Sequence, residues 1–164
     1  MPKNAVGASA HNQPAAPEDA ETQFALGISF AAAPEPHQYP QAMEWYQKAA
    51  DQNHRLAQFN LGQMFALGHG VPKSDSMAVM WIRRAANGGD AGAQYNLGER
   101  YTRASARGSE MDVVESRIEA YKWFTLAAVD LYRDAQERSD LATMQMSKDE
   151  VTEGIRRVKG FVVS

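Results

Sequence analysis

The chain contains no cysteine in its 164 residues. This absence excludes disulfide bonds, thiolate catalysis and thiol-ligated zinc or iron–sulfur sites. An excess of positive charge is also missing, because 17 Lys and Arg residues stand against 20 Asp and Glu residues, for a formal net charge of −3. Such a balance offers no basic surface to nucleic acid, so we expect no nucleic-acid partner.

Long apolar runs are missing as well. No stretch approaches the roughly 18–20 apolar residues of a membrane-spanning helix, so we expect no membrane span. The first residues carry no apolar core of the kind found in secretory signals. We therefore expect a cytoplasmic protein by default, or a periplasmic one if a signal was removed. Residues 1–17 are rich in small and polar residues and poor in large apolar ones, which predicts a disordered tail.

What the sequence does contain is a threefold repeat. Leu-Gly pairs recur 35 and 36 residues apart, and tryptophans recur 36 and 42 residues apart, each tryptophan followed by an Ala-Ala pair. Self-similarity at this period is typical of a solenoid, whose units bury their apolar faces only against one another. The recurring positions are Leu26-Gly27, Leu61-Gly62 and Leu97-Gly98; Trp45, Trp81 and Trp123; and Ala49-Ala50, Ala85-Ala86 and Ala127-Ala128.

The second unit shows how each repeat divides into two helices. Apolar residues at i, i+4, i+7 and i+8 from Ala57 predict one helix. The segment 68–72, with its Gly-His-Gly-Val-Pro sequence, ends that helix. A second helical stripe begins at Ala78, after Ser74 or Asp75, either of which can cap its N-terminus. The pattern therefore predicts pairs of antiparallel helices.

The whole chain is predicted to be all-α, an α/α superhelix of about three helix pairs with a C-terminal half-repeat and a capping helix. The repeat domain is expected at 18–164, with repeats at about 20–54, 55–90 and 91–130 and a cap at 131–160.

Two features define the expected cap. Its first helix buries an apolar stripe, and its second opens with a capping box and buries a stripe of its own. The stripes are Leu131, Ala135, Leu141 and Met144, then Val151, Ile155 and Val158; the capping box is Ser147 with Glu150.

The glycine after each recurring leucine needs a compensation, because a glycine inside a helix costs about 1 kcal/mol relative to alanine. We expect the compensation to be a close approach of the partner helix at its small Ala-Ala pair. Each tryptophan is expected to fill the space between adjacent units.

These motifs resemble the Sel-like repeat, a relative of the tetratricopeptide repeat. The string A-x-x-x-L-G-x-x-Y/F, a Gly-x-Gly-Val loop and A-x-x-W-x-x-x-A-A are nearly complete in residues 57–89, whereas the flanking units lack the loop glycines. The tail also resembles the half-unit that closes bacterial members. The resemblance implies a bacterial, non-enzymatic adaptor that binds a protein or peptide, without a cofactor; we expect no small-molecule ligand.

Candidate binding residues follow from the analogy with tetratricopeptide repeats, whose first helices line a concave groove. An aromatic residue stands two positions before each Leu-Gly pair, almost opposite the buried stripe of its helix. Aromatics repeated along a groove suit an extended peptide or a partner helix. The alternative is that they pack between adjacent first helices. The expected groove residues are Phe24, Ile28, Phe59, Gln63, Tyr95, Glu99, Thr102 and Arg103.

A second candidate patch consists of Arg100, Arg103 and Arg107, which could receive an acidic partner segment. A solvated helix end explains it equally well, because arginine is favoured near the negative end of the helix dipole.

Catalytic motifs find little support. No nucleophile elbow, phosphate loop or dinucleotide fingerprint is present, and the four histidines lack metal-ligand spacing. We expect these histidines, His11, His37, His54 and His69, to be solvated surface residues. The alternatives to an adaptor are an enzyme acting on a cell-wall or polysaccharide substrate, and an immunity or chaperone protein for a secreted partner.

Overall fold

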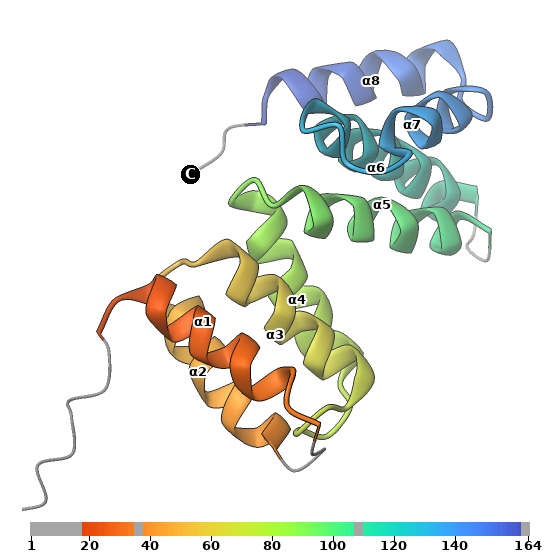
Figure 1. Ribbon diagram of the computed structural model, residues 1–164. Coiled ribbons are helices and arrows are strands. Elements are labelled where there is room, and N and C mark those ends of the chain that lie inside the picture. Colours follow the sequence, from red (N-terminus) through yellow and green to blue (C-terminus); the bar gives the residue numbers. More distant parts are fainter. Residues whose placement is uncertain (1–17, 35–37, 107–109, 162–164) are drawn as a thin grey trace, which may run out of the picture.

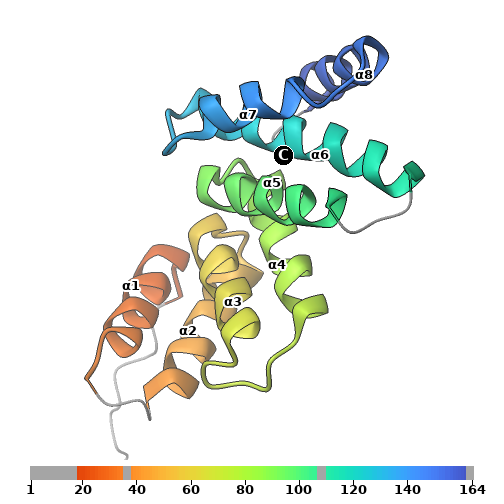
Figure 2. The ribbon, with the colours of Figure 1, turned by 90° about the vertical axis from the view of Figure 1, so that its right-hand side faces the viewer.

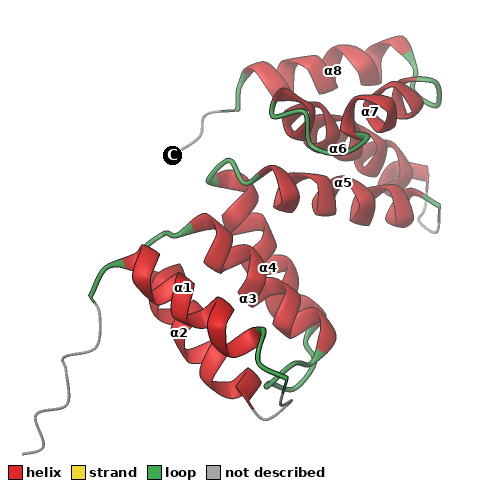
Figure 3. Cartoon of the chain, in the orientation of Figure 1, coloured by secondary structure: helices red, strands yellow, loops and turns green. Residues whose placement is uncertain are grey.

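The structure is a computed structural model that describes residues 18–34, 38–106 and 110–161. These residues form helices and no strands (Figure 3). The predicted tail at 1–17 lies outside the described residues, as do His11, His37 and Arg107. The helices are α1 (Ala20–Ala31), α2 (Tyr39–Asp51), α3 (Arg55–Leu67), α4 (Asp75–Asn87), α5 (Ala91–Ser105), α6 (Glu110–Val129), α7 (Ala135–Thr143) and α8 (Lys148–Lys159).

The helices stack as successive hairpins (Figures 1 and 2). Helix α1 pairs with α2, α3 with α4 and α5 with α6, while α2–α3 and α4–α5 contacts join one pair to the next. The last two helices, α7 and α8, both pack against α6. The predicted all-α superhelix of three pairs, a half-repeat and a cap is thus confirmed. Among the described helices, none has both the length and the apolar character needed to cross a membrane.

The helix boundaries follow the capping chemistry of the sequence. The Ser74 side chain accepts a hydrogen bond from the Met77 N–H at 3.3 Å, and Asp90 accepts one from the Ala93 N–H at 2.7 Å. Each bond satisfies a backbone donor that a helix start leaves unpaired. The predicted capping box of Ser147 and Glu150 is confirmed at the start of α8.

The glycines after the recurring leucines do admit a close helix approach, but the contacting residue differs from the prediction. A Cβ atom built at Gly62 would lie 2.7 Å from Ile82 Cγ1 and 3.1 Å from the Ala78 carbonyl oxygen, so a side chain there would force its neighbours to shift. The contact is therefore made by the residue directly after each tryptophan and not by the Ala-Ala pair, which lies beneath the next unit. The contacting pairs are Gly27 with Tyr46, Gly62 with Ile82 and Gly98 with Phe124.

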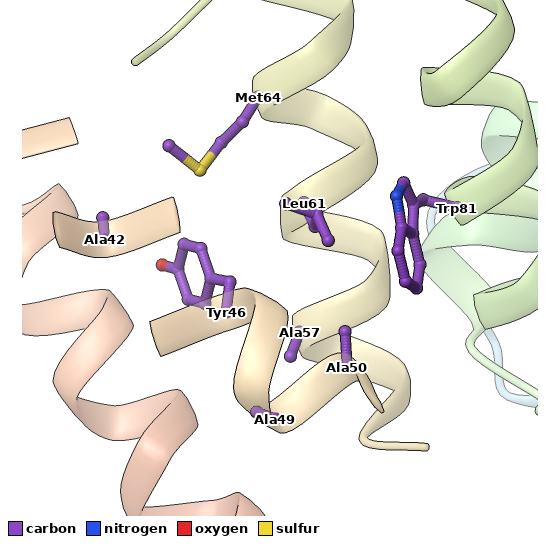
Figure 4. Close-up of a cluster of buried hydrophobic side chains, with 8 residues drawn as sticks. All are labelled: Ala42, Tyr46, Ala49, Ala50, Ala57, Leu61, Met64 and Trp81. Atoms are coloured by element: carbon purple, nitrogen blue, oxygen red, sulfur yellow. The ribbon is translucent and has the colours of Figure 1, made fainter. Parts of the chain in front are cut away.

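The predicted place of the tryptophans between units is confirmed for two of the three. Trp81 is buried in a cluster with Ala50 of the preceding hairpin and Leu61 of its own (Figure 4). Trp123 is 1 % exposed and belongs to a cluster that includes Ile82 and other residues of α4 and α5. Trp45, in the first unit, is only partly buried, and the Lys48 ammonium lies 4.1 Å from its ring centroid. A repeat tryptophan is thus fully buried where a preceding hairpin packs against it.

The predicted apolar stripe of the cap's first helix is right only for Ala135, which is fully buried. Leu131 is 89 % exposed and Met144 is 79 % exposed, and Leu141 is exposed too. Besides Ala135, helix α7 buries Ser139, whose hydroxyl lies 2.8 Å from Thr125 Oγ1 of α6. Small residues with a paired hydroxyl bring α7 close to α6, so its large apolar residues stay outside.

The predicted stripe of α8 is also only partly right, because Ile155 is exposed while Val151 and Val158 are partly buried. The residues that α8 buries are Glu150 and Gly154. Gly154 admits the Tyr121 ring of α6, as in the repeat units. Ion pairs with α6 then hold α8 in place: Arg157 Nη1 donates to Glu115 at 2.6 Å and to Glu119 at 2.8 Å.

Candidate functional site: two pockets between the first helices

The three aromatic residues of the predicted groove contact the start of the next first helix. The Phe24 ring stacks on His54, the N-cap of α3, with centroids 4.4 Å apart. The Tyr95 hydroxyl donates to Asp134, the N-cap of α7, at 2.7 Å. Phe59 packs on the core cluster of α4 and α5, and a Cβ built at Gly92 would lie 3.4 Å from its Cε1. The structure thus places all three between successive first helices, as the alternative interpretation has it.

His54 is not the solvated residue that the sequence suggested, since only 13 % of its side chain is exposed. Its Nδ1 accepts a hydrogen bond from the Ala57 N–H at 3.2 Å, which caps α3. Its Nε2 lies 3.1 Å from a carboxylate oxygen of Glu21 on α1. The histidine therefore joins the first two hairpins, a structural role.

The other predicted groove residues lie on the surface of the first helices. Ile28, Thr102 and Arg103 are exposed, and Gln63 is partly buried. Glu99 is bound within the protein: Arg138 Nη2 donates to it at 2.6 Å, and Arg103 Nη2 lies 3.5 Å away. In the predicted arginine patch, Arg100 and Arg103 bond to residues of their own helix, Asn96 and Glu99.

Two pockets lie between successive first helices, with a second helix as the floor of each. The tyrosine pocket, between α1 and α3, has a volume of about 220 Å³ and includes Gln63. The arginine pocket, between α5 and α7, has a volume of about 160 Å³ and includes Thr102. The tyrosine pocket is lined by Ala31, Tyr39, Tyr46, Asn60, Gln63, Met64 and His69. The arginine pocket is lined by Thr102, Ser105, Arg117, Ala120, Phe124, Arg138, Leu141, Ala142 and Gln145.

The two pockets are equivalent within the repeat. Tyr46 and Phe124 each follow a repeat tryptophan directly, and Tyr39 and Arg117 each stand seven residues before them. On the first helices, Ala31 and Thr102 each stand four residues after the repeat glycine. The same backbone positions therefore carry neutral side chains in one pocket and a cation and a hydroxyl in the other.

The arginines of the second pocket are held by carboxylates from the middle of α5 and from the starts of α7 and α8. Arg117 Nη2 donates to Glu150 at 2.8 Å, and Arg138 Nη2 donates to Glu99. Burial by itself would raise the pKa of Glu150, but hydrogen bonds from Ser147 and Arg117 outweigh it and keep that pKa below its usual value. The hydrogen bond from Tyr95 lowers the pKa of Asp134, which lies 3.3 Å from Arg138 Nε. The lowered pKa values favour the ionised forms of Glu150 and Asp134, which hold the guanidinium groups of Arg117 and Arg138.

Sequence reasoning missed two sets of residues. Buried glutamines bond the last turn of the preceding hairpin: Gln58 Nε2 donates to the Ala50 carbonyl and Gln94 Nε2 to the Ala86 carbonyl, both at 3.1 Å. Their spacing of 36 residues was a visible signal. Arg117 and Arg138 gave no such signal, because only the packing of α7 on α6 brings them to one pocket.

Metal binding finds no geometric basis in the part of the chain that the structure describes, since no group of three or more His, Asp or Glu residues there could hold an ion. The fold and its paired pockets define an α-helical solenoid repeat protein. The sequence pattern of the Sel1 repeat matches residues 20–54, 55–90 and 91–128. The chain belongs to the Sel1 repeat family, whose members are generally protein-interaction modules and typically non-enzymatic scaffolds.

Solved structures with the same fold support this assignment. A protective antigen of uropathogenic Escherichia coli, c5321, which displays an SLR fold, superposes with a TM-score of 0.73 at 28 % identity. A Sel1 repeat protein from Oxalobacter formigenes superposes with a TM-score of 0.69 at 26 % identity. These matches cover 87 % and 89 % of this chain, but only 30 % and 62 % of the two relatives. No curated protein matches the sequence.

Proposed function

We propose that this protein is a non-enzymatic adaptor that binds a segment of a partner protein along its first helices, across the tyrosine and arginine pockets. The observation that carries the proposal is the recurrence of a pocket between successive first helices at equivalent repeat positions. Membership in a family of protein-interaction modules supports it as well.

The exposed residues beside the pockets suit such a segment. Ile28 is 44 % exposed on α1, and Gln63 lines the tyrosine pocket. Thr102 lines the arginine pocket, and Arg103 follows it on the exposed side of α5. Apolar, amide, hydroxyl and cationic groups along one row of helices provide both contact area and hydrogen-bond specificity for a peptide.

The aromatic residues take a different part in this proposal. Phe24, Phe59 and Tyr95 hold the spacing of the first helices, so they shape the binding surface from below. We therefore expect Phe59→Ala to act mainly through stability, at a cost of up to about 3–5 kcal/mol because a large, partly buried side chain that packs on the core is removed.

Crosslinked capture from the native cell tests the proposal. The full chain would be compared with Gln63→Arg and Thr102→Arg, each of which fills one pocket with a long side chain at a position that is not fully buried. The matched control is Met80→Arg, which adds the same charge at an exposed position of α4 outside both pockets. We expect a partner that is retained by the wild type and the control and lost with at least one pocket variant. A partner retained equally by both pocket variants would contradict binding across the pockets.

A further inference from the structure

A further hollow in the surface lies between α4 and α5, apart from the tyrosine and arginine pockets. It has a volume of about 190 Å³ and shares no lining residue with either of those pockets. One wall comes from a second helix, α4, and the other from a first helix, α5, so it does not lie between two first helices. This α4–α5 hollow is lined by Val79, Arg83, Leu97, Arg100, Tyr101 and Ala104.

The repeat register shows why a hollow forms at this junction. At the equivalent junction between α2 and α3, Met64 is buried in the apolar cluster (Figure 4), and Met43 packs against that cluster. The same two positions, 36 residues later, are Arg100 and Val79. A valine is shorter than a methionine, and an arginine keeps its charged end toward water. The space that two methionines occupy at the first junction is thus left partly open at the second.

Two arginines at the hollow have no carboxylate partner in the described part of the chain. Arg83 Nη2 donates to the Tyr101 hydroxyl at 2.8 Å, and Arg100 Nε donates to the Asn96 amide oxygen at 3.0 Å. Both acceptors are neutral, and each guanidinium keeps further N–H donors, since an arginine has five. Arg83 is exposed, and the two Nη atoms of Arg100, which bond to no described residue, are accessible to solvent. The arginines that join α7 and α8 to the rest of the solenoid are, by contrast, paired with glutamates.

The shape and the charge of the hollow together define the chemistry of a ligand. Val79, Leu97 and Ala104 provide apolar surface. An apolar cavity of about 150 Å³ admits a group the size of benzene, so a hollow of about 190 Å³ has room for a leucine-sized side chain. Two cations without internal partners favour carboxylates over neutral or positive groups. A segment in which a large apolar residue has acidic neighbours meets both requirements.

We propose that the α4–α5 hollow binds a large apolar side chain of a partner protein, while acidic residues beside it in that segment pair with Arg83 and Arg100. The sequence suggested an acidic segment for the patch of Arg100, Arg103 and Arg107. In the structure Arg103 already pairs with Glu99, and Arg83 takes its place beside Arg100. The inference goes beyond the proposed function, because it names a second surface that is open whether or not the first helices bind a segment.

Titration of the full chain with blocked tripeptides, followed by NMR at neutral pH and low salt, tests this chemistry. The probe is Ac-Glu-Leu-Glu-NH₂. Its controls are the neutral Ac-Gln-Leu-Gln-NH₂ and Ac-Glu-Ala-Glu-NH₂, which lacks the large side chain. We expect the probe to shift the methyl signals of Val79 and Leu97 and the amide signal of Tyr101 in a saturable way. Each control peptide should bind about tenfold more weakly, because one lacks two exposed charge pairs and the other lacks the buried leucine side chain.

Three variants test the hollow, and each installs the residue found 36 positions earlier in the repeat. Because the first junction accepts these residues, we expect the variants to remain folded, which their amide spectra report. Arg100→Met and Val79→Met fill the space and should lower the affinity for the probe about tenfold. Arg83→Gln removes only an exposed charge and should lower it about threefold. The matched control is Arg156→Gln, which removes an exposed positive charge from α8 and should leave the affinity unchanged.

Several outcomes would overturn the inference. They are equal binding of the probe and either control peptide, an unchanged affinity in both Arg100→Met and Val79→Met, and a loss in Arg156→Gln as large as that in Arg83→Gln. The last result would show general charge attraction only. The fate of the proposed function is read separately, since Gln63→Arg and Thr102→Arg alter residues that do not line the hollow.

Discussion

The two ends of this solenoid use the same repeat positions for different purposes. In the first unit, Tyr39 and Tyr46 line a neutral pocket, and Trp45 lies partly exposed at the end of the stack. In the last unit, Arg117 takes the place of Tyr39, and Trp123 is buried against the preceding hairpin. The comparison teaches that the glycine, tryptophan and alanine positions fix the backbone, while the positions between them are free to set the chemistry of each pocket.

The two ends of the solenoid also differ in the interactions that stabilise them. The first two hairpins pack around an apolar cluster of α2, α3 and α4 (Figure 4). The cap relies on ion pairs: Arg157 contacts Glu115, Glu119 and Glu153, and Arg117 contacts Glu150. Charged contacts depend on pH and salt, whereas apolar contacts do so far less. We therefore expect the two ends to respond differently to the same perturbation.

The largest effect is expected for the buried tryptophan. Trp123→Ala should lower the free energy of unfolding by about 3–5 kcal/mol, because it empties a fully buried site. Trp45→Ala should cost less than half as much, because that ring is partly exposed and lacks an earlier hairpin among the described residues. Urea titration followed by far-UV circular dichroism measures both. Equal losses of unfolding free energy in the two variants would refute the expected difference between a tryptophan at the end of the stack and one inside it.

A repeat glycine gives the next largest effect. Gly62→Leu should lower the free energy of unfolding by about 1–3 kcal/mol through overpacking against Ile82 and the α4 backbone. Helix propensity alone predicts the opposite sign, since leucine is the better helix former. The same urea titration decides between them, with Gln63→Leu as a neighbouring control that does not face α4. A gain in stability for Gly62→Leu would remove the close-approach explanation.

The histidine cap should have an intermediate effect. His54→Ala removes the acceptor for the Ala57 N–H and the stack with Phe24, and should cost about 1 kcal/mol. His54→Asn keeps a capping acceptor and should recover part of that loss. Thermal unfolding of the two variants measures the difference. If both variants match the wild type, the cap and the stack of His54 do not contribute to the stability of the fold.

The smallest expected effect is a local loosening of the cap at acidic pH. Hydrogen bonds from Arg156 and Arg157 lower the pKa of Glu153 from 4.5 to about 2, and Arg157 lowers the pKa of Glu115. Carboxylates with lowered pKa stabilise the folded state fully above their unfolded pKa and lose that contribution as the pH falls toward the folded pKa. We therefore expect α8 to loosen between about pH 4.5 and 2, while the first hairpins keep their packing.

Amide hydrogen exchange, corrected for its intrinsic pH dependence, measures this loosening. Protection factors in α8 should fall relative to those in α3 as the pH is lowered from neutral toward 3. Glu153→Gln, which removes one titrating carboxylate, should flatten the dependence. Parallel loss of protection in both helices would show that the ion pairs do not set the stability of the cap.

Much of the fold could be predicted from the sequence because its signals are local or periodic. The repeat predicted the helix pairs, and Ser74 and Ser147 marked helix starts that the structure bears out. The cap was harder, since its helices bury small and charged residues while Leu131 and Met144 stay exposed. Hydrophobic periodicity cannot detect a face that packs through a paired hydroxyl, a glycine and ion pairs.

The candidate site, like the fold, has a part that the sequence predicts and a part that it does not. The sequence by itself determined that the chain is a Sel1-type solenoid and that Gln63 and Thr102 lie on its first helices. Only the tertiary structure decided that Phe24, Phe59 and Tyr95 pack between those helices, and that Arg117 and Arg138 share one pocket. The physical reason is that a repeat specifies contacts between neighbouring turns and neighbouring units, which recur along the chain. The content of a pocket depends instead on non-repeated side chains that meet only when α7 docks on α6.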